Sequence, residues 1–138
     1  MDRVIFACVH NAGRSQMAAA FFGELADPAR ADAVSAGTAP GERVHPVVVE
    51  VMREVGIDVS TNRPQRLTED LARRASLLIT MGCGDECPHV PGLERDDWPL
   101  RDPKDRPIGE VREIRDEVRG RVAALVDACG WRRSAPAP

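Results

Sequence analysis

Val4-Ile5-Phe6-Ala7-Cys8-Val9 is followed directly by His10-Asn11-Ala12-Gly13-Arg14-Ser15. The first group is apolar without alternation, which is typical of a strand that a parallel sheet buries on both faces. After the second group, Met17, Phe21 and Leu25 recur at every fourth position and form the apolar stripe of a helix. A buried strand, a tight loop and a helix in this order predict one unit of a parallel sheet.

Strands and helices continue to alternate outward from this unit. The apolar patterns predict further strands over 33–36, 76–81 and 93–97, and helices that begin at Pro46, after a cap at Thr68, and at 108. Residues 58–66 have no period, so we expect an irregular connection there. Such alternation predicts an α/β fold, a three-layer α/β/α sandwich in which helices cover both faces of a parallel sheet.

Length and composition indicate one soluble globular domain, since the chain has 138 residues that are 43% hydrophobic and 30% charged. We expect this domain to span 1–131, with a flexible tail over 132–138. A net charge of −3 argues against nucleic acid or an anionic membrane surface as partner. The early apolar run 4–9 is too short for a signal sequence or a membrane span, so we expect a cytoplasmic protein.

The loop between strand and helix has the composition of an oxyanion site. A loop that turns into a helix N-terminus points backbone N–H groups inward, where they bind a tetrahedral anion. Gly13 permits the tight path, and the planar guanidinium of Arg14 can hold two oxygens. The same groups favour a thiolate at Cys8, to which Ser15 can donate a hydrogen bond. The predicted anion-binding residues are Val9, His10, Asn11, Ala12, Gly13 and Arg14.

Four cysteines in a cytoplasmic chain indicate thiol chemistry or metal binding rather than structural disulfides. Cys83 and Cys87 lie in a glycine-bearing loop after the strand predicted over 76–81. With His89 they form a possible zinc site, and two inert loop thiols are a further alternative. For Cys8 the alternative is a small core residue. We expect Cys129, near the end of the last helix, to be a packed or spare thiol.

Four landmarks spread over nearly the whole chain resemble the low-molecular-weight protein tyrosine phosphatase superfamily, and within it the thioredoxin-coupled arsenate reductases. They are Cys8 to Ser15 with Asn11 inside, Ser35-Ala36-Gly37-Thr38, the pair Cys83 and Cys87, and Asp102-Pro103. Where the family loop reads Cys-x-Gly-Asn-x-Cys-Arg-Ser, this chain has His10 for the glycine and Gly13 for the second cysteine. The resemblance implies a four-stranded parallel sheet with strand order 2-1-3-4.

The resemblance also implies a reaction, in which Cys8 attacks arsenate while Asp102 protonates the departing oxygen. Cys83 then attacks the sulfur of Cys8 and releases arsenite, Cys87 attacks Cys83, and thioredoxin reduces the resulting disulfide. No bound cofactor or metal is expected. From the residues alone the acid could be any of four aspartates in one loop region, and the family's Asp-Pro pair selects Asp102 from Asp96, Asp97, Asp102 and Asp105.

Other functions stay open at this point. A tyrosine phosphatase begins with the same step, but the chain contains no Tyr, and Lys104-Asp105 stand where phosphatases usually carry tyrosines. A redox-sensing or metal-binding module is the alternative from another class. The reductant could be thioredoxin, mycothiol or bacillithiol, and we expect a monomer. Residues 17–20 lack the acid that holds potassium in some relatives, so we expect no strong potassium dependence.

Overall fold

The computed structural model describes residues 2–81 and 91–133. Along the chain the helices and strands are β1 (Asp2–Cys8), α1 (Arg14–Leu25), β2 (Ala31–Gly37), α2 (Pro46–Arg53), α3 (Glu69–Arg73), β3 (Leu77–Thr80), β4 (Glu94–Asp97) and α4 (Ile108–Ala128). Each predicted helix and strand is therefore present. The strand predicted over 33–36 is longer than expected, because its parallel pairing with β1 extends from Ala31 to Gly37.

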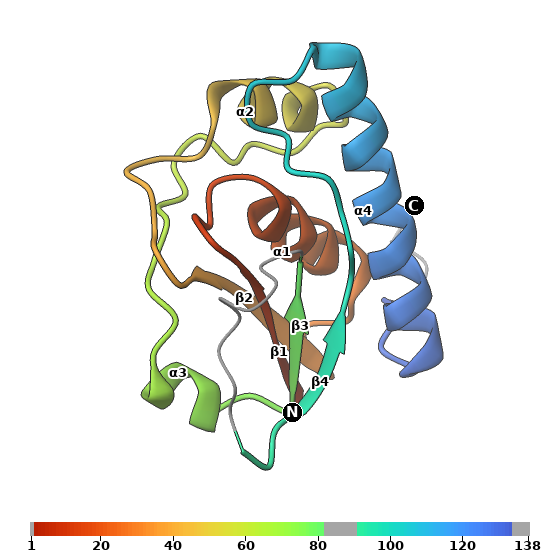
Figure 1. The fold of residues 1–138 in the computed structure, drawn as a ribbon. Helices are drawn as coiled ribbons and strands as arrows, with labels where there is room; N and C mark the ends of the chain where they lie inside the picture. The colour runs from red at the N-terminus through yellow and green to blue at the C-terminus, as the bar shows by residue number, and fades with distance from the viewer. Residues whose placement is uncertain (1, 82–90, 134–138) are drawn as a thin grey trace.

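The four described strands form one parallel sheet in the order β2-β1-β3-β4, which confirms the expected topology. The chain leaves β1 for β2 on one side and returns to β3 on the other, so the direction of winding reverses at β1 (Figure 1). Open parallel sheets bind ligands at the carboxyl ends of the strands beside such a reversal. Cys8, the last residue of β1, lies opposite Gly37 of β2 at this position.

Side chains of β1 alternate between two apolar clusters, and this alternation builds the three layers. Val4, Phe6 and Cys8 belong to the larger cluster, which lies under α1, α2 and α4. Ile5 and Ala7 belong to a smaller cluster on the other face, where α3 contributes Ala72 and Leu71. The sandwich is therefore uneven, with three helices on one face and the short α3 on the other (Figure 1).

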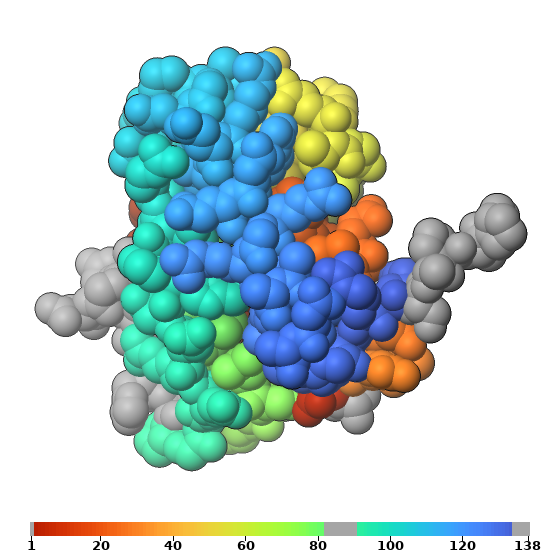
Figure 2. Space-filling model, turned by 90° about the vertical axis from the view of Figure 1, so that its right-hand side faces the viewer, coloured from red at the N-terminus to blue at the C-terminus, as the bar shows by residue number. Residues whose placement is uncertain are grey.

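Helix α4 covers much of the larger layer, where it runs beside α2 and the N-terminal part of the chain (Figure 2). Its buried residues are Val111, Ile114, Val118, Val122 and Val126. These positions are three or four residues apart, so they form the apolar stripe that the sequence predicts. No helix among the described residues is long and apolar enough to cross a membrane.

Two residues of the expected flexible tail are held in place, which corrects the start of the tail at 132. Arg132 forms a β-bridge with Ala26, and the backbone N–H of Arg133 donates to the carbonyl of Leu25 at 2.8 Å. The preceding Trp131 packs edge-on against Phe22, with ring centroids 5.9 Å apart. Because this tryptophan is buried against α1, the residues that follow it also contact the end of α1. Residues 134–138 lie outside the described part of the chain.

Candidate active site

The loop after β1 holds the nucleophile predicted from the sequence in a buried position. Cys8 is 3% exposed and Arg14, the first residue of α1, is 7% exposed. Ser15 and Asn11 are fully buried. The loop therefore brings a thiol, a guanidinium and two polar side chains together where β1 ends and α1 begins.

Asn11 holds the shape of this loop through three hydrogen bonds. Its Nδ2 donates to Oγ of Ser15 at 2.7 Å, and its Oδ1 accepts from the backbone N–H of Gln65 at 2.9 Å. Its backbone carbonyl accepts from Nε2 of Gln16 at 3.0 Å. Asn11 has a φ of 52°, and asparagine enters this left-handed region more readily than most residues. A buried asparagine with these partners keeps the loop in one conformation.

The bonds of Asn11 also set the direction of the next hydrogen bond. Oγ of Ser15 lies 2.9 Å from Sγ of Cys8. Because the backbone N–H of Gln65 can only donate, the amide of Asn11 is oriented with its NH₂ toward Ser15. Ser15 thus accepts from Asn11, and its own proton is free to point at Cys8. The hydroxyl of Ser15 can therefore donate a hydrogen bond to the sulfur of Cys8.

Strand β2 supports the loop from the side, at the Ser35-Ala36-Gly37-Thr38 landmark. A Cβ atom on Gly37 would lie 2.5 Å from the carbonyl oxygen of Val9, so the two backbones are close enough to require glycine. The N–H of Thr38 donates to the carbonyl of Cys8 at 3.3 Å, and the N–H of Ala39 donates to that of Val9 at 2.8 Å. These bonds join the first two carbonyl groups of the loop to the segment that follows β2.

Arg14 and Asp102 meet at the mouth of the loop. Nη1 of Arg14 donates to the backbone carbonyl of Leu100 at 3.0 Å, which fixes the plane of the guanidinium. Nη2 lies 3.7 Å from Oδ2 of Asp102, whose side chain is 46% exposed. The other carboxylate oxygen of Asp102 accepts from the backbone N–H of Lys104 at 3.0 Å. Asp102 is therefore held beside Arg14 and remains open to solvent.

These residues surround a cavity of about 10 Å³, which is about the space that one water molecule needs. Within the described part of the chain it is lined by Cys8, His10, Ala12, Gly13, Arg14, His45 and Asp102. Asp102 is thus the one of the four candidate aspartates that lines the cavity. Asp97, in contrast, accepts a hydrogen bond from Thr80 at 2.6 Å on the edge strand β4.

His45 also lines the cavity, which the sequence did not reveal. Its position before Pro46 indicated only the start of a helix. It is indeed the N-cap of α2, but its backbone N–H donates to the carbonyl of Ala12 at 2.9 Å. Burial lowers the pKa of its imidazole, and the carboxylate of Asp102 opposes that effect. His10 is exposed, and its Nδ1 lies 3.1 Å from the carbonyl of Ala39, so this nitrogen carries the proton.

Cys129 is the one other cysteine among the described residues, and it does not line this cavity. Cys83 and Cys87, and the alternative zinc ligand His89, lie outside the described residues. Cys129 is exposed and lines a different pocket with Asp2, at the opposite end of β1 from Cys8. Among residues 2–81 and 91–133 no group of three His, Cys, Asp or Glu side chains is arranged to hold a metal.

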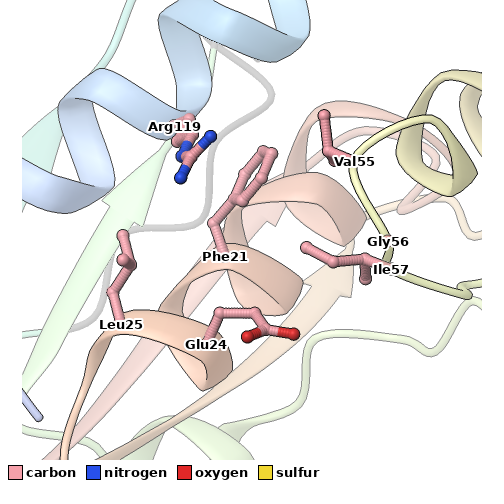
Figure 3. Close-up of a pocket in the computed structure, with 7 residues that line it drawn as sticks. All are labelled: Phe21, Glu24, Leu25, Val55, Gly56, Ile57 and Arg119. Atoms are coloured by element: carbon pink, nitrogen blue, oxygen red, sulfur yellow. The ribbon is translucent and has the colours of Figure 1, made fainter. Parts of the chain in front are cut away.

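A larger pocket of about 320 Å³ lies between α1, α4 and the turn after α2 (Figure 3). The guanidinium of Arg119 lies over the ring of Phe21, 5.9 Å from its centroid, and Glu24 belongs to the next turn of α1. This pocket is at the C-terminal half of α1, away from the loop at its N-terminus. The residues that line it include no cysteine, serine or histidine.

Comparison with known proteins agrees with this geometry. A sequence profile of the low molecular weight phosphotyrosine protein phosphatase family matches residues 3–133. The chain belongs to this family. The match includes the loop 8–15, β2 and the Asp102-Pro103 pair, and so covers every described landmark of the site.

Members of the family with similar sequences carry names related to arsenate. A protein of Halobacterium salinarum, provisionally named an arsenate reductase, is 38% identical over 128 residues, which are 88% of this chain and 89% of that protein. An arsenate reductase of Staphylococcus aureus is 32% identical over 121 residues, or 84% of this chain and 89% of that protein.

Two solved structures of the family share the fold closely. The thioredoxin-dependent arsenate reductase of Corynebacterium glutamicum superposes with a TM-score of 0.80 at 39% identity, over 94% of this chain and 62% of that one. This chain therefore spans less than two thirds of the length of that protein. The arsenate reductase of Archaeoglobus fulgidus superposes with a TM-score of 0.77 at 29% identity, over 90% of this chain and 98% of that one.

Proposed function

We propose that this protein is an arsenate reductase that converts arsenate to arsenite. The observation that carries the proposal is the buried Cys8, hydrogen-bonded to Ser15 and placed with Arg14 around a cavity of about 10 Å³. Backbone N–H groups at a helix N-terminus, beside a guanidinium, suit a small tetrahedral oxyanion. The names of the relatives select arsenate from among such anions.

The first half of the reaction uses the residues that line the cavity. Loop N–H groups and Arg14 hold the oxyanion, and the thiolate of Cys8 attacks its arsenic atom. An As–S bond forms and an As–O bond breaks. Asp102, in its protonated form, gives its proton to the departing oxygen, which leaves as water. The 3.7 Å approach of Asp102 to Arg14 supports this role, because it keeps the carboxyl at the mouth of the loop.

The second half supplies two electrons to arsenic, and here we propose Cys83 and Cys87. Cys83 attacks the sulfur of Cys8, the As–S bond breaks with its electron pair on arsenic, and arsenite leaves. Cys87 then attacks Cys83 and frees Cys8. In support, the N–H of Met81 donates to the carbonyl of Ala7 at 2.9 Å, and Cys83 is two residues further along the chain. Two residues span at most about 7 Å, so this is a short connection from the neighbour of Cys8.

The proposed reductant of the Cys83–Cys87 disulfide is thioredoxin, because the Corynebacterium relative is thioredoxin-dependent. Such a reaction needs no bound cofactor and no metal. It takes place in the cytoplasm, where thiols are kept reduced. We propose that the protein works as a monomer, since the cavity is completed by residues of one chain.

Steady-state turnover with purified components tests the proposal. The assay follows arsenite formation with thioredoxin, thioredoxin reductase and NADPH, for the unaltered chain and for Cys8→Ser, Cys83→Ser and Cys87→Ser. We expect turnover by the unaltered chain and none by the three variants. Full turnover by Cys83→Ser or Cys87→Ser would contradict the relay. Turnover with mycothiol or bacillithiol but not with thioredoxin would contradict the choice of reductant.

A phosphatase activity is the second candidate, since the family profile itself is that of phosphotyrosine phosphatases. Attack by Cys8 on a phosphate ester needs the same loop and acid. Water rather than Cys83 completes that cycle, so hydrolysis of an aryl phosphate should survive Cys83→Ser. We expect it to be slow, because the chain has no tyrosine to stack on an aromatic substrate. Efficient hydrolysis without arsenate reduction would make the protein a phosphatase.

A further inference from the structure

His45 forms one wall of the oxyanion cavity without belonging to the loop. Its backbone N–H bonds to the carbonyl of Ala12, and Pro46 after it begins α2. The ring lies against the loop where Gly13 leaves room, since Cδ2 of His45 is 3.5 Å from the place that a Cβ of Gly13 would occupy. The imidazole is thus anchored beside the anion site by its own backbone.

The free site disfavours a charge on this imidazole. Burial lowers the pKa of His45, and the N-terminus of α2 adds a positive end of a helix dipole. The charged groups that face it pull in both directions: Asp102 and Asp105 favour the imidazolium, and Lys104 and His10 disfavour it. Arg14 lines the same cavity and adds a further positive charge. A dianion captured in the cavity reverses this balance.

We propose that His45 is a further anion-binding residue of this site and takes up one proton from solvent when the oxyanion binds. The proposal rests on the proposed function in taking residues 8–14 as the oxyanion loop. The imidazolium then supplies a positive charge and an N–H donor beside Arg14. When the anion leaves, the proton leaves with it, and the neutral ring no longer competes for the carboxylate of Asp102.

Linkage makes this uptake measurable as a pH dependence of affinity. The affinity of the anion is highest below the pKa of His45 in the free protein and lowest above its raised pKa in the complex. Between these limits it changes about tenfold per pH unit, since one pKa unit is about 1.36 kcal/mol. Sulfate is the suitable probe, because it stays a dianion through the whole range and contributes no proton of its own.

Isothermal titration calorimetry of the full chain with sulfate, between pH 5 and 8, tests the proposal. Repeating each titration in buffers of different ionisation enthalpy gives the number of protons taken up. The measurement is made on the unaltered chain and on Cys8→Ser, which removes the titration of the thiol. We expect an uptake approaching one proton in both, with sulfate affinity that rises about tenfold as pH falls by one unit near neutrality.

Matched variants identify the group. His45→Asn should still bind sulfate but lose both the uptake and the pH dependence, whereas Asp97→Asn, on the edge strand β4 and outside the cavity lining, should keep them. Uptake that persists in His45→Asn, or that disappears in Asp97→Asn, would overturn the assignment to His45. Binding of sulfate with no uptake would overturn this proposal alone. Failure of sulfate to bind at any pH would overturn the oxyanion loop as well.

A second measurement covers the case in which His45→Asn does not fold. The unaltered chain has three histidines, so the imidazole signal of His45 can be followed by NMR with and without saturating sulfate. We expect its pKa to rise by about two units or more on saturation, because an uptake approaching one proton needs a shift of that size. An unchanged pKa would overturn the proposal.

Discussion

Gly13 and Pro103 touch where the oxyanion loop meets the loop of Asp102, since a Cβ on Gly13 would lie 2.7 Å from Cγ of Pro103. The proline ring is rigid and belongs to the backbone, so it cannot turn away. Only glycine fits between the two loops without a shift. The absence of a side chain at Gly13 therefore sets how near Asp102 comes to Arg14.

Gly13→Ala should displace Asp102 and slow the first step of the reaction. A misplacement of a catalytic group by a fraction of an ångström to one ångström lowers kcat by about tenfold to a hundredfold. Gly41→Ala is the control, because a Cβ there meets its nearest atom, the carbonyl oxygen of His10, at an ordinary 3.9 Å. Steady-state arsenate reduction with thermal unfolding checks the prediction. An unchanged kcat in Gly13→Ala would show that the contact is unimportant.

Asn11→Asp should slow the reaction of Cys8 with iodoacetamide. The carboxylate can still accept from Gln65, but it cannot donate to Ser15, whose proton then turns from Cys8 toward residue 11. Loss of one hydrogen bond to a charged group costs about 1.5–3 kcal/mol, which corresponds to roughly tenfold or more in the rate of alkylation. Alkylation at Cys8, followed by mass spectrometry near neutral pH, measures this.

Asn62→Asp is the matched control for Asn11→Asp. Asn62 donates to Oε1 of Gln16 at 3.3 Å and is two hydrogen bonds further from the sulfur. Asn62→Asp adds the same negative charge to the same network. Comparison of the two variants therefore separates the effect of the added charge from the effect of the lost hydrogen-bond donor. Equal slowing by both variants would contradict the directional arrangement at Ser15.

Arg3 and Asp32 should stabilise the β1–β2 pair at neutral pH and not in strong acid. They lie opposite each other in the register and share two hydrogen bonds of 2.9 Å. The hydrogen bond from Arg3 holds the pKa of Asp32 below its usual value. Stability from a lowered carboxyl pKa is present above the unfolded pKa, about 3.9, and is lost as pH falls through the folded pKa.

A double-mutant cycle with Arg3→Met and Asp32→Asn measures this coupling by urea unfolding. We expect at most about 1 kcal/mol at pH 7, because both side chains are about one third exposed and water screens the pair. The coupling should be constant down to about pH 4 and decrease below it. A coupling energy that grows on acidification would rule out the ion pair as its source.

Cys129 should take no part in turnover and should react slowly with thiol reagents. Burial raises the pKa of its thiol, and the carboxylates of Asp2 and Glu94 raise it further. Cys129→Ser is therefore expected to reduce arsenate within about twofold of the unaltered rate, and Glu94→Gln to speed alkylation at Cys129. A large loss of turnover in Cys129→Ser, with an unchanged midpoint of thermal unfolding, would show that Cys129 takes part in the reaction.

Periodicity in the sequence was sufficient to predict the helices and strands, because the buried residues of each one are close together in the sequence. The run 4–9, the stripe of Met17, Phe21 and Leu25, and the apolar face of α4 each bury the residues that the pattern predicts, apart from the half-buried Val9 and Leu25. The strand order followed from family resemblance. The start of the tail at 132 was wrong, because the burial of Trp131 beside Phe22 depends on a contact between distant segments.

The proximity of Cys8, Arg14 and Ser15 was predictable because one loop and one helix turn carry all three, within eight residues of sequence. Local geometry at Cys8, Arg14 and Ser15 follows from the strand-to-helix transition itself. From the residues alone Asp102 was one of four candidate aspartates, and the family's Asp-Pro pair selected it; the structure adds the bond of Arg14 to the carbonyl of Leu100, which brings that segment to the loop. A single sequence has no signal for such a contact across the fold.

His45 lies at the cavity because α2 packs its N-terminus against Ala12, and Gln65 supports Asn11 because the irregular segment passes beside β2. The chain by itself determined which residue types were present and which local structures they form, through propensity, periodicity and spacing. Tertiary structure alone decided which distant side chains share the oxyanion cavity, because packing between layers, not sequence distance, sets which atoms come within a few ångströms.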